Sequence, residues 1–296
     1  MLRTLRAFRG MVMYKSYHAW FFLLPALVLL LVFNFIPAIW VILLSFMEYN
    51  VIQPMEWVGL ANYIRLANDA EFWNALKNTL YYWFLVTPAL VIIPIFVAVL
   101  VNQKLVGIKF FRLTIYFPFL VSVVVTAIMW GWMLRSDGVI NYALSLLNLE
   151  PVSWLTKKST AMPSLAMITI WQGIGYYMLI YLGGLQAIPN ELYESAELDG
   201  AGFLRKQWHI TFPMLRPVIF FVAVVSTMAA FKEFTLMLVM TEGGPLGATQ
   251  TVVYLIFEKA FRSLDMGYAS AIATVLFVII LALTILNRRF LDRETS

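Results

Sequence analysis

Residue types that do covalent chemistry are scarce in this sequence of 296 residues, and their spacing argues against an enzyme. It contains no cysteine, and its two histidines, His18 and His209, are separated by most of the chain, so a thiol site, a histidine metal site or a histidine-based triad is not expected within one subunit. The phosphate-binding Gly-x-x-x-x-Gly-Lys-Ser/Thr motif and the common hydrolase and metalloprotease motifs are also missing. We therefore expect no catalytic residue, no metal site and no cofactor in this chain.

Lys232 and Glu233 are the charged pair in an otherwise apolar segment, between Phe231 and Phe234. A charge at membrane depth costs about 2.5–3.5 kcal/mol on insertion scales, so it usually faces a cavity, a partner or a substrate. Adjacent helical residues point about 100° apart, so these two need not pair with each other. A structural ion pair or a contact with a partner helix is one interpretation, and a side chain facing a solute path is the other.

Three aromatic residues, Trp171, Tyr176 and Tyr177, fall near the same depth in the preceding apolar segment. Their faces can stack on sugar rings, although aromatic residues in such segments more often pack against lipid or the protein core. We treat these residues, with Lys232 and Glu233, as candidates for a substrate path.

The most polar stretch lies between two apolar segments and covers residues 189–206. Pro189 and Asn190 favour the start of a helix that has its glutamates on one face. Asp199 and Gly200 interrupt that helix, and Asp199 is well placed to cap a second one. The pattern predicts two short helices joined by a sharp turn along a membrane surface, and a plain interfacial loop is the alternative.

The composition is strongly apolar: 62% of the chain is hydrophobic and 12% is charged, with a mean hydropathy of +0.82. These values indicate an integral, all-α membrane protein formed from a single domain over residues 1–296. Glycines in the fourth apolar segment favour close helix packing there. The expected spans cover residues 20–47, 79–100, 111–134, 163–187, 217–240 and 267–286, with the loop 189–209 between the fourth and fifth.

Basic residues set the predicted orientation. The formal charge of +5 is placed as the positive-inside rule expects, around the turn near Lys104, the loop near Arg205 and the C-terminal arginines. Both termini are therefore expected in the cytosol, and the scattered charge does not suggest nucleic-acid binding.

Several motifs together resemble those of one transport family. Glu194-Ser195-Ala196, a two-residue gap and Asp199-Gly200-Ala201 resemble the Glu-Ala-Ala loop of bacterial ABC import permeases, with a serine in place of the usual alanine. The turn 243–245 and the segment 266–271 are similar to those of sugar-import permeases of the maltose and glycerol-3-phosphate type.

The resemblance implies a type I importer permease with six transmembrane helices in the bacterial cytoplasmic (inner) membrane. It implies that residues 194–196 and 199–201 form a coupling helix against a cytosolic ATPase subunit. Its expected partners are a second, different permease chain, two ATPase subunits that bind ATP and Mg, an extracytoplasmic solute-binding protein and the lipid bilayer. The solute is a carbohydrate or related compound.

Two other functions are compatible with a membrane protein of this composition. A membrane anchor or assembly scaffold without its own solute path is the alternative, and ATP-dependent solute uptake in liposomes discriminates between the two. An ion channel is disfavoured because no acidic ring or carbonyl filter motif is present.

Overall fold

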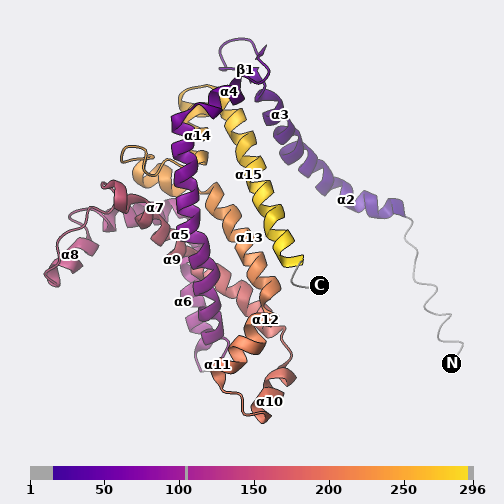
Figure 1. Ribbon diagram of the computed structural model, residues 1–296, viewed down its shortest axis with the longest axis vertical. Helices are drawn as coiled ribbons and strands as arrows, with labels where there is room; N and C mark the ends of the chain where they lie inside the picture. Colours follow the sequence, from indigo (N-terminus) through magenta and orange to yellow (C-terminus); the bar gives the residue numbers. More distant parts are fainter. Residues whose placement is uncertain (1–15, 104–105, 293–296) are drawn as a thin grey trace, which may run out of the picture.

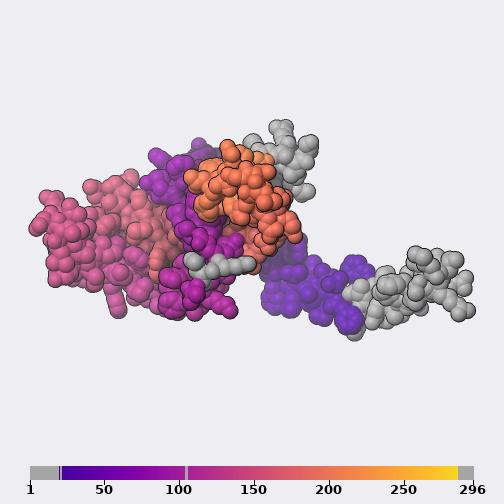
Figure 2. Space-filling view, turned by 90° about the horizontal axis from the view of Figure 1, so that it is seen from below, coloured from indigo at the N-terminus to yellow at the C-terminus, as the bar shows by residue number. Residues whose placement is uncertain are grey.

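The protein is built almost wholly from helices (Figure 1), and the computed structural model describes residues 16–103 and 106–292. The first apolar rod consists of α2 (Ser16–Leu30), the π-helical turn η2 (Leu31–Phe35) and α3 (Ile36–Leu44). Within Phe22–Leu44, only 6% of the residues in the most apolar 18-residue stretch are buried. Figure 2, seen from the opposite end to β1, shows α2 standing apart from the main body. This rod needs lipid or a partner protein to cover it.

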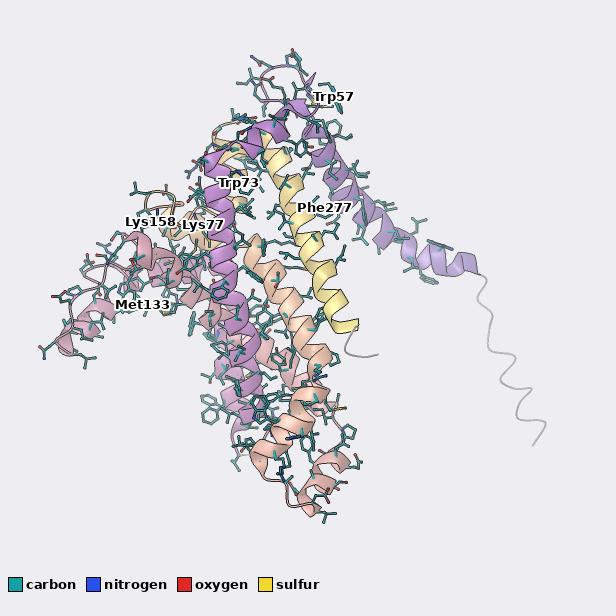
Figure 3. All side chains as sticks on the ribbon, in the orientation of Figure 1. Trp57, Trp73, Lys77, Met133, Lys158 and Phe277 are labelled. Carbon is teal, nitrogen blue, oxygen red and sulfur yellow. The ribbon has the colours of Figure 1, made fainter. Side chains whose placement is uncertain are left out.

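A short polar and aromatic segment follows and lies over one end of the helices. The strands β1 (Met47–Glu48) and β2 (Glu56–Trp57) pair antiparallel and lead to α4 (Ala61–Ala67). The amide of Asn62 donates to the carbonyl oxygens of Ser45 and Met47, at 3.1 and 2.9 Å. Gly267 is required beneath this hairpin, since a Cβ atom there would approach the Met47 carbonyl oxygen to 2.1 Å. The labelled Trp57 marks this end in Figure 3.

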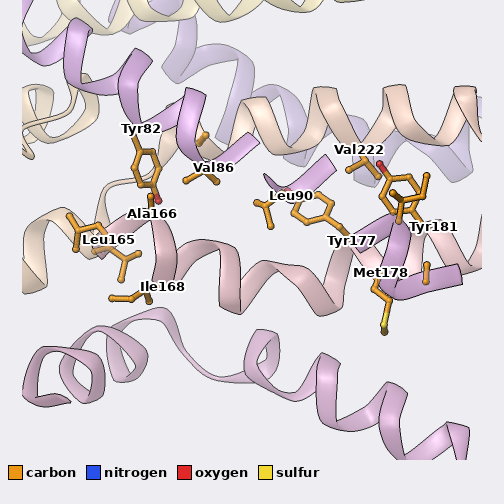
Figure 4. Close-up of a cluster of buried hydrophobic side chains, with 14 of the residues drawn as sticks. Tyr82, Val86, Leu90, Leu165, Ala166, Ile168, Tyr177, Met178, Tyr181 and Val222 are labelled. Atoms are coloured by element: carbon orange, nitrogen blue, oxygen red, sulfur yellow. The ribbon is translucent and has the colours of Figure 1, made fainter. Parts of the chain in front are cut away.

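Three long helices form the centre: α5 (Ala70–Val101), α9 (Lys158–Gln186) and α13 (Arg216–Lys232). Tyr82, Val86 and Leu90 of α5 lie against α9 residues that include Leu165 and Tyr177 (Figure 4). Helix α5 begins nine residues before the predicted second span because Asp69 caps it, accepting a hydrogen bond from the Glu71 amide at 2.8 Å.

The third apolar segment departs most from expectation. The sequence predicts one continuous span over 111–134, whereas the chain forms α6 (Ile108–Leu120) and α7 (Val123–Met133), which are bent by 93°. Pro118 lies just before the bend, where Val121 and Ser122 are extended. Helix α7 and the short α8 (Val139–Leu146) therefore project sideways from the body (Figures 1 and 2).

The remaining elements complete the bundle. They are α10 (Asn190–Leu198), α11 (Phe203–Lys206), η3 (Gln207–Thr211), α12 (Phe212–Met214), η4 (Met237–Thr241), α14 (Val252–Phe257), η5 (Glu258–Arg262) and α15 (Met266–Asp292). Helices α10 and α11 lie at one end of the molecule, and β1 and α4 lie at the other. Among the described residues, five helices are long and apolar enough to cross a membrane, and the bent pair makes six if it counts as one span.

Glycines set the close helix contacts in α9, as the sequence predicts. A Cβ atom on Gly175 would lie 2.3 Å from the Ile115 carbonyl oxygen of α6, and one on Gly184 would lie 2.7 Å from the Val218 side chain of α13. Gly183 differs, because a Cβ atom there would meet nothing within 4 Å. Small residues thus bring α6 and α13 against opposite parts of α9.

Candidate functional site

The fifth apolar segment is interrupted where its charges lie. Helix α13 ends at Lys232, and Glu233 is extended, with φ −65° and ψ 128°. Oxygen Oε1 of Glu233 accepts hydrogen bonds from the amides of Phe234 and Leu236, both at 3.1 Å. The side chain of Thr251 donates to the Glu233 carbonyl at 3.3 Å. Glu233 therefore partners backbone groups that the break would otherwise leave unsatisfied in the membrane.

The bend between α6 and α7 lies close to this break and is supported in a similar way. The side-chain amide of Gln172 in α9 donates to the Val121 carbonyl oxygen at 2.9 Å and reaches Thr126 Oγ1 at 3.4 Å. A polar side chain from a neighbouring helix thus satisfies the carbonyl that the bend frees.

A cavity of about 480 Å³ borders both breaks. Its lining combines aromatic faces, polar side chains and one carboxylate, contributed by Leu90, Phe119, Val121, Val123, Thr169, Gln172, Gly173, Tyr176, Tyr177, Val225, Ala229 and Glu233. The rings of Phe119 and Tyr176 stack with centroids 4.6 Å apart. The hydroxyl groups of Tyr82 and Thr169 are hydrogen-bonded at 2.6 Å, which fixes Thr169 at the wall. Such a lining suits a ligand that has both apolar faces and hydroxyl groups.

The structure separates the five predicted path residues into two groups. Glu233, Tyr176 and Tyr177 line the cavity. Trp171 is not in that lining, and it packs edge-on against Trp130 of α7 at 5.4 Å.

Lys232 is also outside the cavity lining, and its side chain is exposed. No ion pair between Lys232 and Glu233 is found among the described residues. The assumption that both charges lie within one continuous helix is wrong, because α13 ends between them.

Sequence reasoning missed Phe119 and Gln172. Pro118 was a usable signal for a bend that brings Phe119 to the cavity, and an amide in an apolar helix was a signal for Gln172. Neither signal identifies the carbonyl of Val121 as the acceptor, because that contact joins segments 51 residues apart.

The polar stretch 189–206 forms the two predicted short helices, α10 and α11, with a turn at Gly200, whose φ is +75°. A left-handed conformation at this position favours glycine. Asp199, however, does not cap the second helix: it ends α10, and Gly202 precedes α11 without a side-chain cap. The N-cap position of α11 is therefore Gly202, three residues beyond Asp199, and the helix starts at Phe203.

Helix α10 is joined to the rest of the chain through Tyr193 and Glu197. Tyr193 packs against the core and shares a hydrogen bond with Thr211 at 2.9 Å, and Lys206 contacts Glu197 at 2.6 Å. Glu194 and Ser195 are exposed, Ala196 and Ala201 are half-buried, and Asp199 and Gly200 are exposed. Leu198 is 90% exposed and Leu204 is 71% exposed. These exposed apolar side chains beside carboxylates are typical of a protein contact surface.

The opposite end is held together by polar contacts within the chain. Lys259 contacts Glu71 at 2.6 Å, and Arg65 contacts Asp265 at 2.7 Å. Burial by itself raises the pKa of the Asp69 carboxyl, but the hydrogen bond from Tyr268, the backbone amides and the charge of Lys259 together hold that pKa below its ordinary value.

Comparison with known proteins decides the family. The model of the family described as "Binding-protein-dependent transport system inner membrane component" matches residues 8–295. The chain belongs to this family. It is therefore a membrane-embedded transport component of an ABC system, and the family's members are not enzymes.

Curated relatives of this permease extend over nearly its full length. It is 35% identical over 267 residues to the arabinooligosaccharides transport system permease protein AraP of Halalkalibacterium halodurans, covering 88% of this chain and 83% of AraP. It is 33% identical over 265 residues to the trehalose/maltose transport system permease protein MalF of Thermococcus litoralis, covering 89% and 90%.

The fold also matches a solved structure. A chain of a bacterial alginate ABC transporter, in complex with an alginate pentasaccharide-bound periplasmic protein, superimposes with a TM-score of 0.85 at 23% identity, covering 95% of this permease and 96% of that chain. The type I importer fold that the sequence motifs imply is confirmed.

Proposed function

We propose that this permease forms one half of the solute path of an ATP-driven importer for a carbohydrate or a related polyhydroxyl solute. The observation that carries the proposal is the cavity at the two helix breaks, where aromatic faces lie beside Gln172, Thr169 and Glu233. Aromatic faces pack against the apolar faces of sugar rings, while the polar groups bond ring hydroxyls. Relatives named for arabinooligosaccharide and trehalose/maltose transport support the same solute class.

The α10–α11 end is the proposed contact with a cytosolic ATPase subunit, in which ATP and Mg bind. Glu194 is exposed on α10, where it is available to accept charge-assisted hydrogen bonds. The same proposed contact surface includes the neighbouring residues Ser195, Ala196, Asp199, Gly200 and Ala201. Both termini are then cytosolic, and an extracytoplasmic binding protein delivers the solute at the opposite end.

A second, different permease chain is the proposed other half of the path. The rod α2–α3 and the side chain of Lys232 are both exposed in the isolated chain, and a partner permease or lipid must cover the rod. The expected assembly is a heterodimer. A stable, transport-competent homodimer of this chain with its ATPase subunits would contradict it.

Lys232 allows a specific test of that assembly. Replacement by methionine keeps the side chain's length and removes its charge. If Lys232 pairs with a carboxylate of the second permease, Lys232→Met leaves that partner's charge unpaired, and we expect the complex to lose about 3 kcal/mol of stability. If it faces the path, transport changes and the assembly stays intact. Wild-type stability with wild-type transport would exclude both roles.

The function itself is tested by reconstituting this permease in liposomes with its second permease, ATPase subunits and binding protein. The proposal expects saccharide uptake that depends on both ATP and the binding protein. Assembly without uptake of any saccharide would favour the scaffold alternative instead.

A further inference from the structure

We infer that the cavity at the helix breaks selects against anionic sugars, so that the solute this permease carries is a neutral, hydroxyl-bearing saccharide and not a uronate or a sugar phosphate. This inference rests on the proposed function, since it assigns the solute class of the same cavity. It starts from one residue, Glu233, the single charged side chain in the lining.

The position of Glu233 is fixed by the backbone. Its Oε1 atom accepts hydrogen bonds from the amides of Phe234 and Leu236. Its backbone carbonyl accepts a hydrogen bond from the Thr251 hydroxyl. The carboxylate therefore cannot swing away from the wall without leaving two amides unpaired in an apolar environment. A solute in this cavity meets a carboxyl group at a fixed place.

That carboxyl group still has bonding capacity. A carboxylate offers about four lone-pair sites over its two oxygens, and the backbone amides of Phe234, Thr235 and Leu236 occupy at most three of them. Sugar hydroxyls are donors and can occupy the remaining sites. A solute carboxylate has no proton to donate at neutral pH, and a phosphate monoester carries a charge of about −1.5 to −2 there. Either group places like charges side by side where screening by water is weak.

No nearby cation offsets this charge within the described part of the chain. Lys232 is exposed and does not line the cavity. The other polar side chains in the lining are those of Thr169, Gln172, Tyr176 and Tyr177, so the lining holds no lysine, arginine or histidine. The aromatic pair Phe119 and Tyr176 adds an apolar wall, which further disfavours an ion. The arrangement suits a neutral sugar ring.

Glu233→Gln separates selectivity from structure. Glutamine keeps a side-chain oxygen that accepts the Phe234 and Leu236 amides, so the break is preserved while the charge is lost. Direct binding to the purified permease–ATPase complex in nanodiscs excludes the selectivity of the binding protein. The probes are radiolabelled neutral disaccharides and the matched uronic acids, in which a carboxylate replaces the C6 hydroxymethyl group.

In wild-type complex we expect each neutral disaccharide that binds to do so at least about tenfold more tightly than its uronate, a difference equal to about 1.4 kcal/mol. In Glu233→Gln the ratio should fall to about threefold or less, chiefly because uronate binding improves. The control is Gln103→Glu. Gln103 is exposed just after the end of α5 and does not line this cavity, so its new charge should leave the wild-type ratio unchanged.

The possible results distinguish a failure of the proposed selectivity from a failure of the proposed import function. Equal or tighter uronate binding in wild type, or a ratio that Glu233→Gln leaves unchanged, overturns the inference while the carbohydrate importer stands. Binding of neither disaccharides nor uronates, together with no saccharide uptake by the complete liposome system, overturns the proposed function itself.

Discussion

The two ends of this permease satisfy their polar groups in different ways. At the β1–α4 end, Arg65 pairs with Asp265 and Glu71 pairs with Lys259, and each contact joins segments about 200 residues apart in the chain. At the α10–α11 end, Glu194 is exposed, and Leu198 is 90% exposed. The first end is tied together by the chain's own contacts. The second presents carboxylates and apolar side chains that another protein can use.

From this contrast we expect substitutions at the two ends to differ in whether they change the stability of the permease or its coupling to other subunits. Substitutions in the packed helices or at the tied end should lower the free energy of unfolding. Substitution of the exposed Glu194 on α10 should leave unfolding nearly unchanged and alter coupling to other subunits.

Gly175→Ala should be the most destabilising of these changes. Its Cβ atom would meet the Ile115 carbonyl oxygen at 2.3 Å and the Tyr116 Cα at 2.5 Å, so backbone must move, at a cost of about 1–3 kcal/mol. Gly183→Ala is the matched control on the same helix, with nothing within 4 Å. Thermal unfolding of the detergent-purified complex measures both. Equal melting temperatures for the two variants would mean that α6 does not pack against α9 in this way.

Gly200→Val should have an intermediate effect that is confined to the exposed end. An added Cβ atom meets no atom within 4 Å, but φ is +75°, where a side chain costs about 1–2 kcal/mol. We expect the turn between α10 and α11 to distort, with loss of ATPase co-purification and membrane insertion intact. Gly202→Val, where φ is −68°, is the comparison. Coupling that is equally impaired in both variants would argue against the turn conformation as the cause.

Asp69→Asn should have a small, pH-dependent effect at the tied end. The pKa of Asp69 is lowered in the folded protein, so its stabilising contribution is present above the unfolded value of about 3.9 and is lost as pH falls through the folded value. The difference in melting temperature between wild type and Asp69→Asn should therefore be larger at pH 7 than at pH 3.

A second substitution identifies the partner in that effect. Tyr268 donates a hydrogen bond to Asp69, so in a Tyr268→Phe background the difference at pH 7 should shrink. A difference between wild type and Asp69→Asn that grows as pH falls would have the wrong sign for a lowered pKa and would contradict the assignment.

The sequence predicts the membrane class, the two short helices at 189–206 and the close packing of Gly175 and Gly184, because each depends on composition or local spacing. It predicts Glu233, Tyr176 and Tyr177 as path candidates only by type and depth. It does not reveal the 93° bend, because Gln172, which supports the freed carbonyl, lies 51 residues further along the chain. It misplaces Asp199 as a cap, because local propensity does not fix how far the turn at Gly200 extends.

The central claim, that the exposed α10 end couples this permease to an ATPase, is tested most directly by Glu194→Ala beside Glu191→Ala. Both residues are exposed on α10, so each substitution should change unfolding by no more than about 0.5 kcal/mol. The measurement is ATPase co-purification together with binding-protein-stimulated ATP hydrolysis in reconstituted complex. We predict that Glu194→Ala lowers both with unchanged melting temperature, while Glu191→Ala stays near wild type. Wild-type attachment and hydrolysis in Glu194→Ala would contradict the claim.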